Sequence, residues 1–421
     1  MVFMKNIINK LFSSVISRLS VFLVQMLSLL VLSRLVSVEA FGVFALINGV
    51  CFLLMMLAEF GVTQSIINKK DSCYQLLYEF SLKVSAFFSI STPLFLYLLT
   101  IIFDIELTLF IYIAIPIIVF LFGVTSICLG DLNKRFQFKL VAISETAAEL
   151  IALVAVMLVI SIYGASYEVL VLKVLLFSIT RALLITFYFK KQCDRRDLIF
   201  KLSFSIGKIE SFNKGVVLSN LASFLVRQGD NFLVGKLFGI VMLGLYDRAY
   251  QLVKYPVMLL SFSLQPALQP IMRTVDCYTL FRKIILATWL LCILAGLSLT
   301  LIFNLYSNYI INIILGAGWE EIDFIVKILS YSIAFQCFFS LSGGFFYAIE
   351  VSGKNALVNT ITFILISLSF YIGYINESIK AGLYLVTISF FIVSVLCLLL
   401  LLKEGKQFYK KNKLENKPCH V

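Results

Sequence analysis

The sequence is poor in charge and in histidine, and both shortages limit what the chain can do. Only 14% of its 421 residues are charged, while 61% are hydrophobic and the mean hydropathy is +1.00. Because roughly a quarter of the residues in a soluble domain are charged, this composition indicates an integral membrane protein. The one histidine, His420, lies in the C-terminal tail, which excludes imidazole catalysis. The nine cysteines include no CxxC pair, so we expect no metal centre.

Acidic residues are scarcer than basic ones, and the basic surplus follows a regular pattern. The chain has 35 lysines and arginines against 23 aspartates and glutamates, a net charge of +12. The basic residues lie between apolar runs rather than on one soluble module, which disfavours nucleic-acid binding. They occupy the N-terminus, every second loop and the tail, while the loops at 104–106, 163–167 and 308–319 contain none. By the positive-inside rule, both termini should be cytoplasmic.

Long apolar runs make up most of the chain. A helix needs about 20 apolar residues to cross roughly 30 Å of hydrocarbon, and the sequence has twelve such runs. The first continues from the N-terminus to Leu35 and lacks the cleavage site of a signal peptide. The others lie at about 41–67, 82–103, 107–129, 141–162, 168–189, 215–235, 245–272, 284–306, 322–349, 356–375 and 381–402.

The runs form two sets of six that resemble each other. Residues 19–25 align without a gap on 221–227, and 34–44 on 236–246, which indicates an internal repeat. Six helices per half give both halves the same orientation. We therefore expect an all-α polytopic membrane protein with twelve transmembrane helices in two six-helix lobes, related by a pseudo-two-fold axis along the membrane normal. The expected parts are an N-terminal lobe (1–189), a basic cytoplasmic linker (190–214), a C-terminal lobe (215–402) and a cytoplasmic basic tail (403–421).

The linker at 190–214 mixes basic residues with leucine, isoleucine and phenylalanine. This pattern suits an interfacial helix that lies on anionic headgroups and joins the halves. A basic loop that only fixes the topology explains the composition equally well.

Charged side chains inside the apolar runs are the candidates for function, because burying them in the membrane costs several kcal/mol unless they face a partner or water. Arg18, Arg227 and Lys254 are cations at such depth, which favours an anionic ligand. Arg18 and Arg227 occupy the corresponding first helices of the two halves. Asp230 lies one helical turn from Arg227, so it either orients Arg227 toward a ligand or merely neutralises it.

Carboxylates at depth have a different interpretation. Glu59 and Glu149 are candidate proton or sodium sites, with hydrogen bonding between helices as the alternative. Five further charges lie near the ends of the apolar runs, and we predict that their side chains extend to the headgroups: Glu145, Lys173, Asp247, Arg248 and Lys327. Arg181, about three turns from the cytoplasmic end of its run, could extend there as well.

Two segments resemble a known family. The first, LSRLVSVEAFGVFALINGVCFLLMMLAEFGVTQSIINKKD at 32–71, is similar to the opening of bacterial Wzx-type polysaccharide flippases, particularly their WzxC-like branch. The second is RQGDNFLVGKLFGIVMLGLYDRAYQLVKYPVMLLSFSLQPALQPIM at 227–272. There, as in that branch, a helix with buried charges leads through a Gly-Leu-Tyr turn into a proline-rich helix. The resemblance spans both halves, while the last four helices are generic.

The resemblance implies the fold of the multidrug/oligosaccharidyl-lipid/polysaccharide exporter superfamily, with two lobes around a central cavity and alternating access. It implies a cargo of undecaprenyl-diphosphate-linked oligosaccharide, moved across the bacterial inner membrane for O-antigen (lipopolysaccharide), capsule or exopolysaccharide assembly. Membrane lipids, the polysaccharide polymerase and the chain-length machinery would be partners. No cofactor is implied, and a proton or sodium gradient is the candidate energy source.

A lipid diphosphate is strongly anionic, so we expect Arg18, Arg227 and Lys254 to bind it, with Asp230 orienting Arg227. Two other classes stay open. A cation-coupled drug or small-molecule exporter of the same fold should rely on acidic residues, whereas the deep charges here are biased to basic. A membrane glycosyltransferase or polymerase should have a sizeable periplasmic loop or an acidic motif. Because the outer loops are short, we expect that the protein is not an enzyme.

Overall fold

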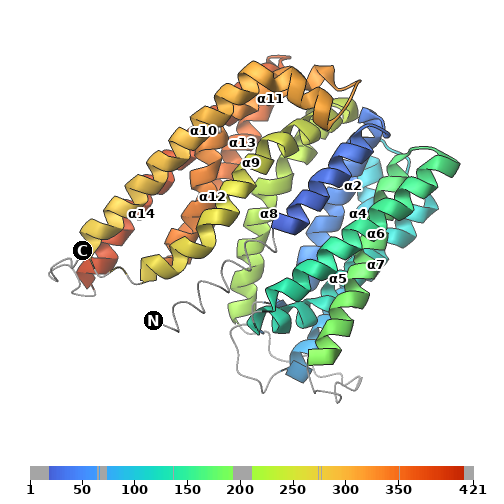
Figure 1. Ribbon diagram of the computed structural model, residues 1–421, viewed down its shortest axis with the longest axis horizontal. Coiled ribbons are helices and arrows are strands. Elements are labelled where there is room, and N and C mark those ends of the chain that lie inside the picture. Colours follow the sequence, from blue (N-terminus) through green and yellow to red (C-terminus); the bar gives the residue numbers. More distant parts are fainter. Residues whose placement is uncertain are drawn as a thin grey trace. The chain divides into compact units, whose positions relative to one another are not determined.

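The computed structural model describes residues 19–63, 66, 74–135, 137–192, 211–273, 275, 277–349 and 351–411, and the regular elements among them are helices (Figure 1). The chain divides into two compact units, Met1–Phe224 and Leu225–Val421. The division falls inside α8 (Ser211–Phe238), so this helix contributes residues to both units.

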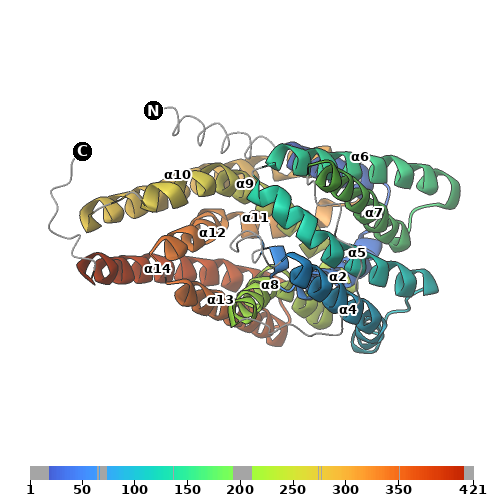
Figure 2. The ribbon, with the colours of Figure 1, turned by 90° about the horizontal axis from the view of Figure 1, so that it is seen from below.

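The first unit is built from long apolar helices that pack side by side. Helix α5 contacts both α4 and α7, and α7 also lies along α6 (Figure 2). The side chain of Ser37 starts α2 by accepting a hydrogen bond from the Ala40 amide at 3.3 Å. A helix at Leu19–Ser33 precedes α2. The elements that follow it are α2 (Val38–Glu59), α4 (Tyr74–Phe103), α5 (Leu109–Lys134), α6 (Phe138–Tyr163) and α7 (Tyr167–Gln192).

Helices α4 and α5 approach each other closely at Gly123. A Cβ atom at this position would lie 2.0 Å from Ser85 Oγ, so the packing requires glycine. The Ser81 hydroxyl donates a hydrogen bond to the Gly123 carbonyl at 2.8 Å. Small residues and a hydroxyl therefore hold this pair together, as is common between helices in membranes.

In the second unit, α8 turns into α9 (Ile240–Arg273) at Gly239, whose φ of +90° is a conformation that favours glycine. Helices α13 and α14 run side by side, and α12 contacts both α9 and α14 (Figures 1 and 2). The elements after α9 are α10 (Tyr278–Ile314), the 3₁₀ turn η2 (Glu320–Ile322), α11 (Asp323–Ser330), α12 (Ile333–Ala348), α13 (Ser352–Ile375) and α14 (Ile379–Lys411).

Residues 322–349, which the sequence predicts as one span, form two helices. The pair η2–α11 and α12 are bent by 59° at a short break. Neighbouring helices satisfy carbonyl groups at the break. Thr300 of α10 donates to the Ser330 carbonyl at 2.7 Å, and Thr387 of α14 donates to the Ile328 carbonyl at 3.3 Å. The break is therefore stabilised by hydrogen bonds, which a bend at membrane depth requires.

Eight helices of the described residues are long and apolar enough to cross a membrane, or nine if the bent pair is one span. Helices α8 and α9 have 28 and 34 residues, but they carry several charges and are not among the eight. The all-helical membrane class is thus established, while the count of twelve stays a prediction. Most of the linker, at 193–210, lies outside the described residues. Helix α14 continues to Lys411, into the segment predicted as a tail.

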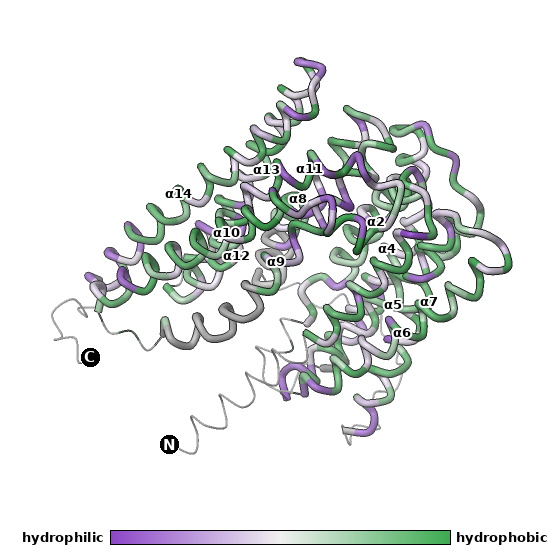
Figure 3. Tube along the Cα trace, turned by 45° about the horizontal axis from the view of Figure 1, so that its top comes forward, coloured by the Kyte–Doolittle hydropathy of each residue, from purple (hydrophilic) through white to green (hydrophobic). Residues whose placement is uncertain are grey.

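The outer surfaces of the helices are apolar. Large hydrophobic side chains are strongly exposed, among them Ile90 at 79%, Leu109 at 75% and Tyr163 at 82%. Figure 3 shows apolar residues along the helices and hydrophilic residues gathered mainly toward helix ends and connections. Such extensive exposed apolar area is the surface that lipid tails cover.

Candidate functional site: the charges of α8 and α9

The second unit buries a carboxylate where α8 meets α9. Asp230 of α8 is only 3% exposed, and it accepts a hydrogen bond from the Tyr246 hydroxyl at 2.7 Å. The backbone amide of Asn231 donates to the same carboxylate at 3.0 Å. A buried carboxylate needs such donors, so Tyr246 and Asn231 stabilise Asp230.

Two tyrosines and a lysine follow one face of α9 at four-residue spacing. The rings of Tyr246 and Tyr250 are stacked, with centroids 5.8 Å apart and planes 18° apart. The Lys254 ammonium lies 5.8 Å from the centroid of the Tyr250 ring, within the range of a cation–π contact. Contacts thus run without interruption from Asp230 through the two rings, which we call the tyrosine pair, to Lys254.

Arg227 lies one turn before Asp230 on α8 and is exposed within its unit. Its charge acts on Lys254 and on Tyr250, and the charges of Asp230 and Asp247 also act on Lys254. No carboxylate of the described residues lies within ion-pairing distance of Arg227 or Lys254. The charges of Arg227 and Lys254 therefore act on each other, and neither has a carboxylate at ion-pairing distance in that part of the chain, an arrangement that a bound anion would relieve.

The remaining charges of this region neutralise one another. Asp247 accepts hydrogen bonds from Arg248 Nε at 3.1 Å and Nη2 at 2.5 Å. It also accepts from the Gln251 amide at 3.1 Å and from the Asn231 side chain at 3.3 Å. Because Asp247 has several donors, its role is to join α8 to α9.

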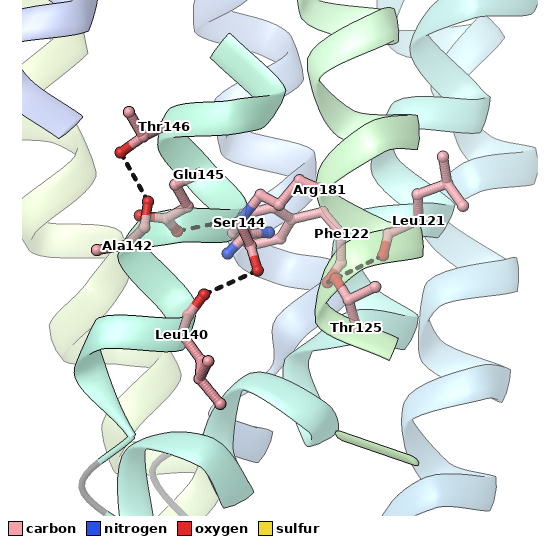
Figure 4. A network of polar contacts seen from close by, with 9 residues as sticks. All are labelled: Leu121, Phe122, Thr125, Leu140, Ala142, Ser144, Glu145, Thr146 and Arg181. Carbon is pink, nitrogen blue, oxygen red and sulfur yellow. Dashed lines mark hydrogen bonds and ion pairs between the residues drawn. The ribbon is translucent and has the colours of Figure 1, made fainter. Parts of the chain in front are cut away.

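The first unit contains a second group of charges, between α6 and α7. Arg181 Nε lies 3.2 Å from Glu145 Oε1, and the guanidinium lies 5.3 Å from the centroid of the Phe122 ring (Figure 4). The hydroxyls of Ser144, Thr146 and Thr125 donate to carbonyls of their own helices. This group is therefore one ion pair, between buried Arg181 and partly exposed Glu145, against an aromatic ring.

The two candidate coupling carboxylates differ in their surroundings. Glu149 pairs with Lys173 of α7. Glu59 of α2 lies beside the Thr63 hydroxyl, and the charge of Arg181 acts on it. Glu149 therefore has a cationic partner, whereas the described residues offer Glu59 a hydroxyl and a more distant arginine.

The prediction that side chains extend to the headgroups is wrong for Asp247, Arg248 and Lys173. Lys173 pairs with Glu149 instead, and Arg181 does not extend to the headgroups either. The side chains of Arg181, Asp247 and Arg248 are only 8%, 11% and 7% exposed, and each forms an ion pair inside its unit. Their charges attract partners more strongly than distant headgroups can, because little water reaches them.

The structure brings Arg227, Asp230 and Lys254 into one cluster. Arg18 lies outside the described residues. Asp230 is held by Tyr246, and the described ion pairs do not include one between Asp230 and Arg227. Sequence reasoning missed Tyr246 and Tyr250, although their four-residue spacing from Lys254 was a signal that these side chains share a helix face.

Solved structures show which fold this all-helical membrane protein has. It resembles an inward-facing multidrug resistance MATE family transporter of the MOP superfamily, with a TM-score of 0.71 and 11% identity over 96% of this chain and 100% of that chain. The lipid II flippase MurJ, in an inward closed conformation, has a TM-score of 0.70 and 14% identity over 95% of this chain and 90% of that chain. A MOP superfamily transporter from Pyrococcus furiosus has a TM-score of 0.63 and 12% identity over 97% of this chain and 96% of that chain. The chain therefore shares its fold with these transporters.

The family itself follows from the sequence match. The profile of the family described as polysaccharide biosynthesis protein matches residues 31–324, well over half of the chain. The chain belongs to this family. A comparison with curated protein sequences finds no significant match.

Proposed function

We propose that the protein is a flippase for undecaprenyl-diphosphate-linked oligosaccharide repeat units. It moves them across the bacterial inner membrane by alternating access, for O-antigen, capsule or exopolysaccharide assembly. Two findings support the class of function. The family is one of polysaccharide biosynthesis, and the fold is that of transporters, including one whose name describes lipid II flipping.

The proposal includes an architecture. Twelve spans form two six-helix lobes, 1–189 and 215–402, related by a pseudo-two-fold axis along the membrane normal. A basic linker (190–214) and a basic tail (403–421) lie in the cytoplasm with both termini. The WzxC-like branch is the proposed subgroup, and polymerase and chain-length proteins are the proposed partners.

The observation that carries the proposed site is the pair of cations Arg227 and Lys254, whose charges act on each other. Other deep cations have carboxylates: Arg181 pairs with Glu145, Lys173 with Glu149, and Arg248 with Asp247. A unit charge about 4 Å from another contributes about 4 kcal/mol at an effective dielectric constant of 20. Two such cations would offset much of the cost of moving a diphosphate out of water.

Each residue then has a role. Arg227 and Lys254 bind the diphosphate or acidic sugars, with Arg18 as a further candidate in the other half. Asp230 acts through Tyr246, which fixes the tyrosine pair under Lys254. Of the proposed coupling carboxylates, Glu59 is the better candidate for proton or sodium binding, because Glu149 already pairs with Lys173.

Deleting the gene and analysing lipid-linked intermediates tests this function. Completed repeat units should accumulate on undecaprenyl diphosphate at the cytoplasmic face, while surface glycan disappears. Failure to assemble the repeat unit at all would indicate an enzyme instead. Unchanged glycan together with greater drug sensitivity would indicate a drug exporter of the same fold.

A further inference from the structure

Helices α10 and α14 of the second unit are longer than a bilayer requires. They have 37 and 33 residues, which correspond to about 55 and 50 Å at 1.5 Å per residue, against roughly 30 Å of hydrocarbon. Large exposed apolar side chains end at Leu399 on α14. The last turns of α14, with the first turns of α10 beside them (Figures 1 and 2), therefore extend beyond the lipid tails.

This extension is a well-packed part of the unit. Phe281 and Tyr409 are 0% and 1% exposed, and their rings lie 5.4 Å apart. A Cβ atom on Gly405 would lie 2.3 Å from the Phe281 ring, so α10 and α14 are in close contact here. The Tyr278 hydroxyl donates to the Leu402 carbonyl at 3.2 Å. The side chains on its surface therefore project from a fixed backbone.

The exposed charged side chains at this end of the unit are basic, and we call them the basic collar: Arg282, Lys283, Lys354, Lys403, Lys406 and Lys410. Residues 278–289 and 400–411 contain one acid, Glu404, which is mostly buried and lies 3.5 Å from Lys354 Nζ. Lys403, Lys406 and Lys410 recur at three- and four-residue spacing, so they share one helix face. Figure 3 shows hydrophilic residues at this end of α14.

We propose that the basic collar is a binding surface for the headgroups of anionic phospholipids. Its position matches their level, since Lys403 lies only about 6 Å along the helix from Leu399 and the headgroup layer begins where the hydrocarbon ends. A protein partner would need an aromatic or apolar anchor at the centre of the interface. Here the aromatic side chains Phe281 and Tyr409 are buried inside the extension. Leu280, 41% exposed, is the one large apolar side chain exposed among the described residues of 278–289 and 400–411, beside the six exposed cations of the basic collar. This pattern matches a layer of phosphate groups.

The test titrates the purified full-length protein in detergent with phosphatidylglycerol or phosphatidylcholine and counts bound lipids by native mass spectrometry. The wild-type protein should prefer phosphatidylglycerol. The double variant Lys403→Gln, Lys406→Gln should lose about fivefold in phosphatidylglycerol affinity per lysine removed, the factor equivalent to 1 kcal/mol. Arg282→Gln, Lys283→Gln tests the same collar from α10.

The control is Lys380→Gln, which removes an exposed lysine at the opposite end of α14 from the basic collar. It should keep wild-type affinity. Equal binding of the two lipids, unchanged affinity in both collar variants, or an equal loss in the control would each overturn the proposal. All the substituted residues are exposed, and thermal unfolding without added lipid checks that each variant is folded.

Discussion

Replacing Tyr246 with phenylalanine tests the hydrogen bond that stabilises Asp230. Both residues are buried, at 0% and 3% exposure, and the hydroxyl lies 2.7 Å from the carboxylate. The substitution removes one oxygen and keeps the ring, so the stack on Tyr250 is preserved. A hydrogen bond to a charged group contributes about 1.5–3 kcal/mol. Since the backbone amide of Asn231 still donates to the carboxylate, we expect the free energy of unfolding to fall by an amount near the lower end of this range.

The assay is thermal unfolding of the purified protein in detergent. For a unit of this size, each kcal/mol lowers the midpoint by about 2–4 °C. The control is Tyr371→Phe on α13, because that side chain is 54% exposed and its hydroxyl removal should change little. An unchanged midpoint in Tyr246→Phe, or an equal drop in the control, would refute the role assigned to this hydroxyl.

Three further substitutions have defined outcomes. Gly296→Val should strongly lower the yield of folded protein, because even a Cβ atom at this position would lie 2.3 Å from Ala334 Cα. Size-exclusion chromatography measures this yield. Glu145→Gln should lower the free energy of unfolding by about 2 kcal/mol, less than the 3–5 kcal/mol lost when a fully buried ion pair is broken, because Glu145 is 27% exposed. An unchanged unfolding midpoint would contradict a stabilising role of the ion pair between Glu145 and Arg181. Tyr250→Leu removes the ring beside the Lys254 ammonium, so this variant should bind farnesyl diphosphate more weakly than the wild-type protein. Tyr250→Phe keeps a ring there and should bind it as the wild-type protein does. Equal binding by both variants would count against the cation–π contact.

The course of the helices could be predicted from hydropathy because each span must satisfy its own backbone hydrogen bonds in the membrane. The run 356–375 and helix α13 (Ser352–Ile375) end at the same residue. The break at 331–332 could not be predicted, because no proline or glycine marks it. It depends on side chains of α10 and α14 that are distant in sequence. The helical continuation of α14 to Lys411 likewise depends on Tyr409 packing against Phe281.

The candidate charges could be found from the sequence because each interrupts an apolar run, but their partners could not. Glu149 and Lys173 belong to different helices, and only the packing of α6 on α7 brings them together. Asp230 is one turn from Arg227, yet it bonds to Tyr246 of the next helix. Spacing within one helix therefore identifies possible pairs, whereas contacts between helices decide which pairs form.

Flipping in proteoliposomes tests the central claim most directly. The purified protein is reconstituted with a short-chain prenyl-diphosphate oligosaccharide carrying a fluorescent sugar, and reagent accessibility measures its transfer between leaflets. We predict transfer by the wild-type protein and by Lys327→Gln, whose lysine pairs with Asp323, and loss of transfer in Arg227→Ala, Lys254→Ala. Wild-type transfer by that double variant would contradict the assigned site, and no transfer by the folded wild-type protein would contradict the proposed function.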